Sequence, residues 1–113
     1  MIKIYHNPRC KKSREGLAIL ENSGKEFEIV KYLENFLSKK ELSNIIDLLK
    51  ISPIELVRKN ERIWKENYKG KELSDAEIIE AMTIHPKLIE RPIVTNNMDA
   101  IIGRPPELIK NIL

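Results

Sequence analysis

The chain has a single cysteine, Cys10, at the point where a short strand gives way to a helix. The pattern of Ile2–Tyr5 is typical of a strand, and that of residues 11 to about 22 is typical of a helix. The N-terminus of a helix has unpaired backbone N–H groups and the positive end of the helix dipole, which both favour negative charge. A thiol placed there ionises readily, with its pKa lowered from about 8.5 into a range of roughly 3.5 to 7.5. Because only the thiolate is nucleophilic, the sequence predicts a reactive Cys10.

The small number of cysteines and histidines excludes several classes of protein. One cysteine cannot form a disulfide within the chain, and one cysteine with two histidines is too few for a structural zinc site. His6 and His85 lie far apart and lack the spacing of metal ligands, so we expect no metal.

The overall charge and hydropathy limit the possible partners. The net charge of +3 suits an anionic substrate or a nucleic acid. Aromatic residues make up only 5% of the chain and are not interleaved with a basic block, so we expect no nucleic-acid partner. The chain enters a strand pattern directly, and no apolar run approaches the roughly 20 residues of a membrane span. We therefore expect no membrane partner and a cytoplasmic location.

The first helix is expected to bury Leu17, Ala18 and Leu20, with Ile19 as a further candidate for the same stripe. It ends at Gly24, which suits the left-handed position after a helix. Phe27–Val30 follows as a second strand. A strand, helix and strand connected in this way form a parallel, right-handed unit.

Three capping boxes, in which a serine is followed three residues later by glutamate, mark helical segments in the middle of the chain. The boxes are Ser38–Glu41, Ser52–Glu55 and Ser74–Glu77. His85–Pro86 ends the third segment. Between the second and third boxes, Trp64 and Tyr68 are expected to pack a connecting turn.

The pattern returns to strands after this helical region. Residues 91–95 and 100–102 are short apolar runs on either side of the turn Asn96–Asp99, which predicts an antiparallel hairpin. Residues 103–107 then open a last helix.

The order of these elements, β-α-β, helices, then β-β-α, predicts an α/β protein with a thioredoxin-like fold and a mixed four-stranded sheet. The helices between the two halves form an insertion at about residues 38–86. A chain of 113 residues is the size of one domain, so we expect a single domain over 1–113.

Three arginines, Arg58, Arg91 and Arg104, lie near predicted turns. The planar guanidinium of arginine binds a tetrahedral oxyanion with two donors and stays charged. In a thioredoxin-like topology Pro92 begins the strand nearest the active-site helix and is a candidate cis proline, which aims Arg91 at Cys10. The spacing does not show that the three converge, and each could instead form a surface ion pair.

Two further residues near Cys10 are candidates for its activation. His6 could lower the thiol pKa or orient the loop by a hydrogen bond. Ser13 could donate its hydroxyl to the thiolate or cap the first helical turn. Ser13 also stands where a dithiol motif needs its second cysteine, which excludes internal dithiol chemistry. Arg14 follows the cysteine too closely for a phosphatase loop.

These motifs resemble the ArsC family of glutathione/glutaredoxin-linked arsenate reductases, and the resemblance covers essentially the whole chain. It rests on His6–Cys10 with Ser13 and Arg14, on Leu56–Arg58, on Leu88–Val94 and on Ile102–Glu107. The resemblance implies that Cys10 is the nucleophile, that His6 tunes the thiolate, and that Arg58, Arg91 and Arg104 hold the oxyanion. We assign Ser13 to the catalytic set as well, and Asn7 and Arg14 to the substrate-binding set.

The implied reaction is covalent. The Cys10 thiolate attacks arsenate and forms an enzyme-bound arsenic thioester, glutathione attacks next, and glutaredoxin returns the electrons, which leaves arsenite. A redox-active cysteine of this kind needs no bound cofactor, and glutathione is its co-substrate. The single thiol agrees with this chemistry, because it must take its resolving thiol from another molecule.

Two alternatives stay open at this stage. The Spx regulators are similar in fold and bind RNA polymerase without catalysis, although they usually carry a second cysteine where this chain has Ser13. A thiol reductase acting on another oxyanion or on a glutathione adduct is the other alternative, since a fold alone does not determine function.

Overall fold

The computed structural model describes residues 1–113, which divide into two compact units. The first unit comprises residues 1–35 and 91–113, and the second comprises residues 36–90. The second unit extends a few residues beyond each end of the predicted helical insertion. The assignment of the whole chain to one domain stays a prediction.

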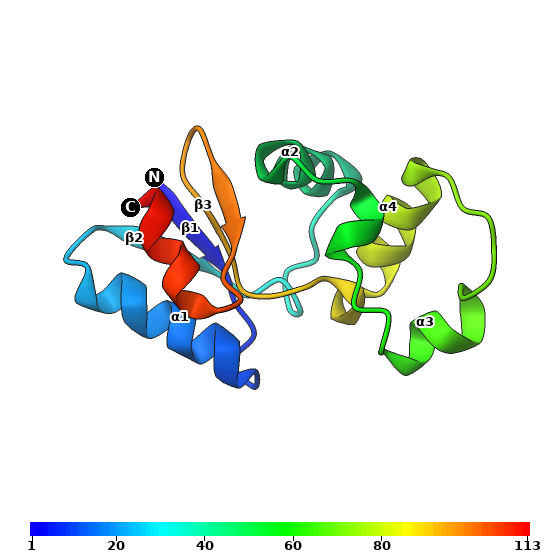
Figure 1. Ribbon diagram of the computed structural model, residues 1–113, viewed down its shortest axis with the longest axis horizontal. Helices are drawn as coiled ribbons and strands as arrows, with labels where there is room; N and C mark the ends of the chain where they lie inside the picture. Colours follow the sequence, from blue (N-terminus) through cyan, green and yellow to red (C-terminus); the bar gives the residue numbers. More distant parts are fainter. The chain divides into compact units, whose positions relative to one another are not determined.

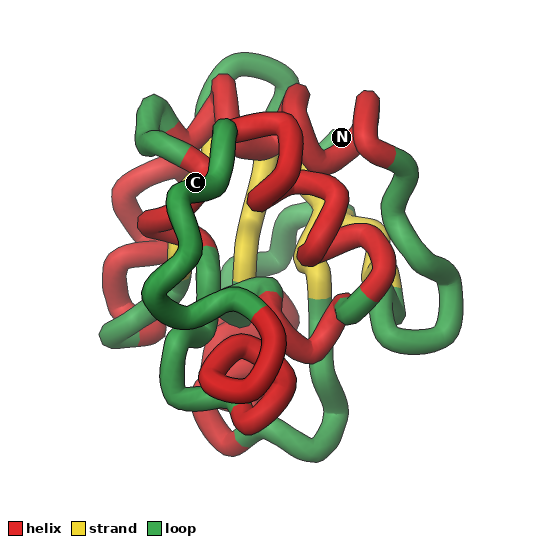
Figure 2. Tube along the Cα trace, turned by 90° about the vertical axis from the view of Figure 1, so that its right-hand side faces the viewer, coloured by secondary structure: helices red, strands yellow, loops and turns green.

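The first unit is built on a four-stranded sheet in the order β2-β1-β3-β4 (Figures 1 and 2). The strands are β1 (Ile2–Tyr5), β2 (Phe27–Val30), β3 (Ile93–Thr95) and β4 (Ala100–Ile102). β1 is parallel to β2 and antiparallel to β3, and β3 is antiparallel to β4. The predicted parallel unit, the predicted hairpin and the mixed thioredoxin-like sheet are therefore confirmed.

The core of the first unit lies between this sheet and two helical elements, α1 (Lys11–Asn22) and η3 (Pro106–Ile112), which pack against each other (Figure 1). Its central residues come one each from β1, α1, β3 and η3, and all four are fully buried. They are Ile4, Leu20, Val94 and Ile109. The last helix predicted from the sequence is present, but as a 3-10 helix.

The expected burial of Ala18 is wrong, because this residue is exposed. Gly16 and Leu20, which lie two residues to either side of it, are buried, as is Ser13 one turn earlier in α1. A helix places residues two apart on different faces, so a stripe centred on 16 and 20 turns Ala18 outward.

The second unit is helical. Its elements are α2 (Lys39–Leu49), η1 (Pro53–Leu56), α3 (Arg62–Asn67), α4 (Asp75–Ile84) and η2 (Pro86–Leu88). α4 packs against α2, η1 and η2. None of the helices in the two units is long and apolar enough to cross a bilayer.

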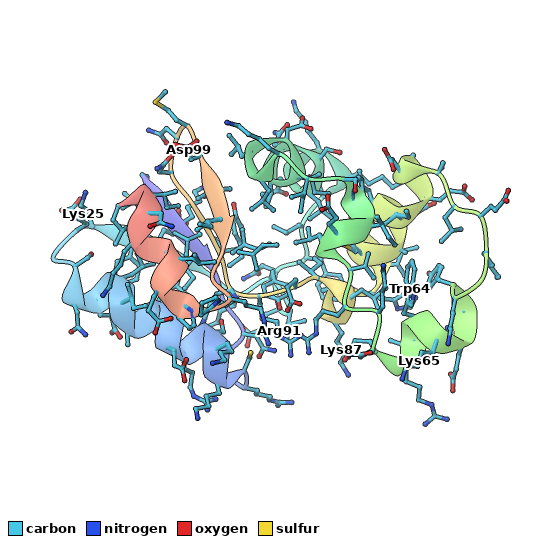
Figure 3. All side chains as sticks on the ribbon, viewed as in Figure 1. Lys25, Trp64, Lys65, Lys87, Arg91 and Asp99 are labelled. Carbon is cyan, nitrogen blue, oxygen red and sulfur yellow. The ribbon has the colours of Figure 1, made fainter.

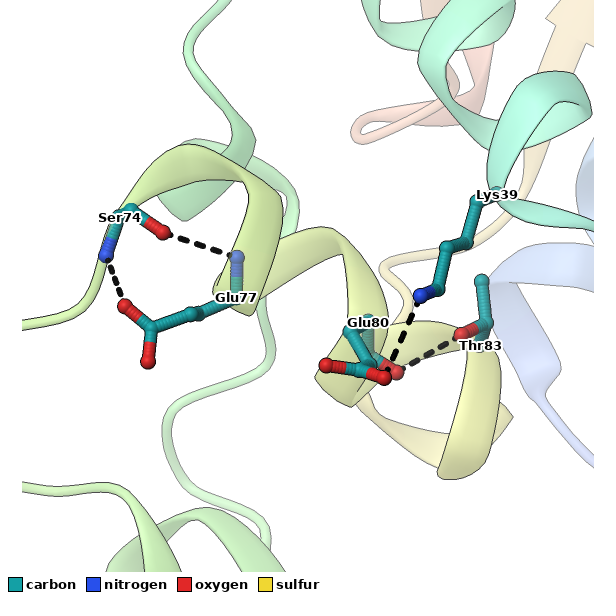
Figure 4. Close-up of polar contacts among 5 residues, drawn as sticks. All are labelled: Lys39, Ser74, Glu77, Glu80 and Thr83. Atoms are coloured by element: carbon teal, nitrogen blue, oxygen red, sulfur yellow. Dashed lines mark hydrogen bonds and ion pairs between the residues drawn. The ribbon is translucent and has the colours of Figure 1, made fainter.

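Capping boxes start α2 and α4 where the sequence predicted them. In the α4 box the Ser74 hydroxyl accepts from the Glu77 N–H at 3.2 Å, and the Glu77 carboxylate accepts from the Ser74 N–H at 2.9 Å (Figure 4). Such caps satisfy two otherwise unpaired N–H groups, and each contributes about 1 kcal/mol to stability. An exposed ion pair of 3.3 Å between Lys39 and Glu80 also links α2 to α4 (Figure 4).

The predicted turn around Trp64 and Tyr68 contains a short helix, α3, that the sequence did not reveal. Trp64 lies on α3 (Figure 3) and is buried. Its ring stacks on that of Tyr68, the residue after the helix, with the ring centroids 5.3 Å apart. Six residues are too few to display a helical apolar period, and no serine cap precedes the segment.

Gly16 allows close packing inside the first unit. A Cβ atom at this position would lie 2.9 Å from the Ile109 Cδ1 atom and 2.9 Å from the Pro92 Cγ atom. The Ile109 side chain is fully buried and the proline ring cannot rotate away, so neither neighbour can yield easily.

We expect Gly16→Ala to lower the free energy of unfolding by about 1–3 kcal/mol through this overpacking. Helix propensity alone favours alanine over glycine by about 1 kcal/mol, so the two effects have opposite signs. Urea denaturation of the wild type and the variant measures the difference. A variant more stable than the wild type would contradict the packing argument.

Candidate active site

Cys10 is the N-cap residue of α1, with an extended backbone at φ −95° and ψ 123°. Its thiol is free and partly buried. Burial alone raises the pKa of this thiol, but the backbone N–H of Ser13, the hydrogen bond and charge of the Arg91 side chain, and the N–H of Lys12 lower it. The lowering contributions prevail, so the pKa of Cys10 lies below the ordinary value for cysteine.

The loop before α1 is held by its own polar groups. The Cys10 N–H donates to the Asn7 carbonyl and the Arg9 N–H donates to Asn7 Oδ1, both at 3.0 Å. Arg14 Nη1 donates to the Pro8 carbonyl at 3.0 Å. Asn7 and Arg14 therefore brace the loop that presents the thiol. Their assignment to substrate binding stays a prediction.

Ser13 is fully buried and connects this loop to His6. Its Oγ lies 2.7 Å from His6 Nδ1 and accepts from the Asn7 N–H at 3.0 Å. The Ser13 hydroxyl thus bonds to His6 and Asn7, whereas its backbone N–H stabilises the Cys10 thiolate. Neither contribution that the sequence allowed for the Ser13 hydroxyl is displayed, because α1 has no side-chain cap hydrogen bond and donation of the hydroxyl to the thiolate stays a prediction.

His6 is buried, and its pKa is lowered mainly by burial and further by the positive charges of Lys31 and Arg14. The lowered pKa favours the neutral imidazole over the cation. Its hydrogen bond with Ser13 orients the residue whose backbone N–H faces the sulfur. A hydrogen bond that can orient the loop is thus present, and the effect of His6 on the pKa of the thiol stays a prediction.

Two of the three predicted arginines belong to the same unit as Cys10. The Arg91 side chain hydrogen-bonds the Cys10 thiol, and Arg91 lies in the segment that enters β3 (Figure 3). The Arg91–Pro92 peptide is cis, as the sequence predicted, and so is Arg104–Pro105. Arg104 Nη1 donates to the Arg91 carbonyl at 3.1 Å, which ties Arg104 to the residue beside the thiol.

The third arginine, Arg58, belongs to the second unit and follows η1 directly. Its Nη1 donates to Glu90 Oε1 at 2.7 Å in a partly buried ion pair. Its convergence with the other two arginines stays a prediction. Glu90 was not a candidate in the sequence analysis, although its position next to Arg91 in the segment Leu88–Val94 was a usable signal.

No group of three His, Cys, Asp or Glu side chains is placed to hold a metal ion.

These features define a thioredoxin-like protein with one activated cysteine beside an arginine. The chain belongs to the ArsC family, and the sequence model of that family matches residues 5–112. It is 48% identical over 117 residues to the uncharacterized protein YfgD of Escherichia coli K12, covering 99% of this chain and 96% of that protein. It is 46% identical over 112 residues to the arsenate reductase of Haemophilus influenzae, with 97% of each chain covered.

A solved structure agrees with this membership. The arsenate reductase from Vibrio cholerae superposes with a TM-score of 0.94 at 46% sequence identity. The match covers 99% of this chain and 97% of the Vibrio chain. The thioredoxin-like architecture of the first unit and the helices of the second are thus those of an ArsC protein.

The reactivity of the thiol tests the contribution of Arg91. In the wild type, the rate of Cys10 alkylation by iodoacetamide should rise with pH around a midpoint below the ordinary pKa of a cysteine thiol. Arg91→Gln should move the midpoint upward, because it removes a positive charge next to the sulfur. Lys12→Gln is the matched control, since the Lys12 side chain pairs with Glu15 and only its backbone N–H serves the thiolate. Equal midpoints for the wild type and Arg91→Gln would show that Arg91 does not lower the pKa of Cys10.

The lowered pKa of His6 makes stability depend on pH. The unfolded chain takes up a proton at His6 near pH 6.5, whereas the folded chain resists it until a lower pH. The stability that neutral His6 contributes is therefore complete above the His6 pKa of the unfolded chain. It is lost as the pH falls from there toward the His6 pKa of the folded chain. His6→Asn keeps a polar group near Ser13 but does not titrate. Urea denaturation at about pH 7.5 and about pH 5.5 should show a larger acid loss in the wild type than in the variant. Identical losses would show that His6 does not contribute.

Proposed function

We propose that this protein is an arsenate reductase in which Cys10 is the nucleophile. The observation that carries the proposal is the lowered pKa of a partly buried thiol, stabilised by the Ser13 N–H and the Arg91 guanidinium. A thiolate beside a fixed cation is suited to attack a tetrahedral oxyanion, because the same cation attracts the anion. Similarity to proteins named arsenate reductase supports arsenate as that anion.

The proposed first step forms a bond between the Cys10 sulfur and arsenic(V), while one arsenate oxygen leaves as water after protonation. Arg91 offsets the negative charge of the anion next to the thiolate. Arg104 keeps the Arg91 backbone in place through its hydrogen bond to the Arg91 carbonyl, and we assign its guanidinium to the anion as well. Arg58 is the third arginine that we assign to the anion.

The proposed second stage needs thiols from outside the chain, since Cys10 is the only cysteine. Glutathione displaces a second arsenate oxygen as water and forms a sulfur–arsenic bond. A glutaredoxin thiol then attacks the glutathione sulfur, which forms a mixed disulfide and leaves the electron pair on arsenic. Arsenic is thereby reduced to arsenic(III), and water releases arsenite from Cys10. We propose glutathione as the co-substrate and glutaredoxin as the partner.

A coupled assay tests this proposal. The purified, reduced protein should oxidise glutathione in the presence of arsenate, and turnover should depend on added glutaredoxin. Cys10→Ser should abolish turnover, because a serine hydroxyl at this site is not ionised. Replacing arsenate by phosphate or sulfite identifies the preferred oxyanion. Absence of turnover at millimolar arsenate in the wild type, or unchanged turnover in Cys10→Ser, would overturn the proposal.

A further inference from the structure

The second unit contains an ion pair between Arg58, which is assigned to the anion above, and Glu90, which has no role in the reaction described so far. Arg58 Nη1 lies 2.7 Å from Glu90 Oε1, and the two side chains are only 24% and 26% exposed. The other arginine pair of this unit, Arg62 with Glu66, is far more exposed, at 88% and 55%. The Arg58–Glu90 pair is therefore better shielded from water and salt than an ordinary surface ion pair.

The backbone fixes both ends of this pair. The Arg58 N–H donates to the Leu88 carbonyl at 2.7 Å, and the Glu90 N–H donates to the Leu56 carbonyl at 2.9 Å. Between these two bonds Val57 and Ile89 form an antiparallel bridge, and both are buried. Arg58 and Glu90 thus lie diagonally opposite each other on two short paired segments of backbone. The backbone pairing therefore holds the two side chains close together.

The contact with Glu90 determines which side of the guanidinium stays available. Glu90 binds Nη1, which lies on the same side of the planar group as Cδ. The opposite edge consists of Nε and Nη2, and Arg58 Nε is buried with no hydrogen-bond partner in the protein. A buried N–H without a partner is rare and points to a ligand that completes it. Nε and Nη2 together form one of the forks with which arginine binds two oxygens of an oxyanion.

We propose that Glu90 is a positioning residue that holds Arg58 with its Nε–Nη2 edge presented to the oxyanion. This inference deepens the proposed function and rests on it, because it takes Arg58 to be one of the arginines that bind arsenate. Glu90 itself does not touch the substrate. Its carboxylate keeps Nη1 occupied, which leaves one orientation of the guanidinium instead of several.

A double-mutant cycle separates positioning from a general loss of structure. Glu90→Ala should raise the KM for arsenate about tenfold, as expected for the loss of an oriented charged donor, and should change kcat much less. In an Arg58→Ala background the same change should have no further effect on KM. Glu90→Gln keeps an acceptor for Nη1 and should restore most of the affinity. Glu66→Ala, which removes the carboxylate of the exposed Arg62 pair, is the matched control and should leave KM unchanged.

A second measurement detects arsenate binding at the Nε–Nη2 edge of Arg58 without any turnover. In nitrogen-15 NMR spectra of the full chain, the Arg58 Nε–H signal, assigned by its loss in Arg58→Ala, should shift when arsenate is added. In Glu90→Ala a higher arsenate concentration should be needed for the same shift. This experiment stands apart from the coupled assay, so a protein that binds arsenate at Arg58 but does not reduce it overturns the proposed function and supports the positioning role.

The opposite outcomes overturn the inference even if the protein is an arsenate reductase. An active wild type whose KM is unaffected by Glu90→Ala would show that Arg58 needs no positioning. An equal rise in KM in the wild-type and Arg58→Ala backgrounds would show that Glu90 acts by another route. If the Arg58 Nε–H signal does not shift at saturating arsenate, the Nε–Nη2 edge does not bind the anion.

Discussion

The site depends on a negative charge that the fold stabilises at the start of α1. Burial of the Cys10 sulfur opposes ionisation, and the Ser13 N–H together with Arg91 outweighs it. The two supports come from distant parts of the sequence, one from the first helical turn and one from the segment that enters β3. The lowered pKa of the thiol is therefore a property of the assembled first unit, because a peptide containing Cys10 alone lacks the arginine.

Much of this arrangement could be predicted from the sequence, because it depends on short patterns of neighbouring residues. The capping serines Ser38 and Ser74 mark helix starts by bonding to groups within the same turn. The turn between β3 and β4 and the position of Cys10 before α1 are also local patterns. Pairing of strands then follows from the few topologies that short connections allow.

The features that the sequence did not reveal depend on contacts between side chains of different segments. The Ser13 hydroxyl lies against His6, and the Glu90 carboxylate lies against Arg58, at 32 positions' separation. Single residues in a sequence do not indicate which polar group they will meet. The exposure of Ala18 was missed for a different reason, since Gly16 has no apolar side chain to show that it faces the core.

Pro92 is held between two glycines, and this has a consequence for the thiol. A Cβ atom at Gly16 would lie 2.9 Å from the Pro92 Cγ atom, and one at Gly103 would lie 3.0 Å from it. The proline ring thus fills a slot with helical backbone on one side and the end of β4 on the other. Its neighbour Arg91 is the cation beside the sulfur. Two residues without side chains therefore leave the space into which Pro92 packs, next to the arginine that lowers the pKa of the thiol.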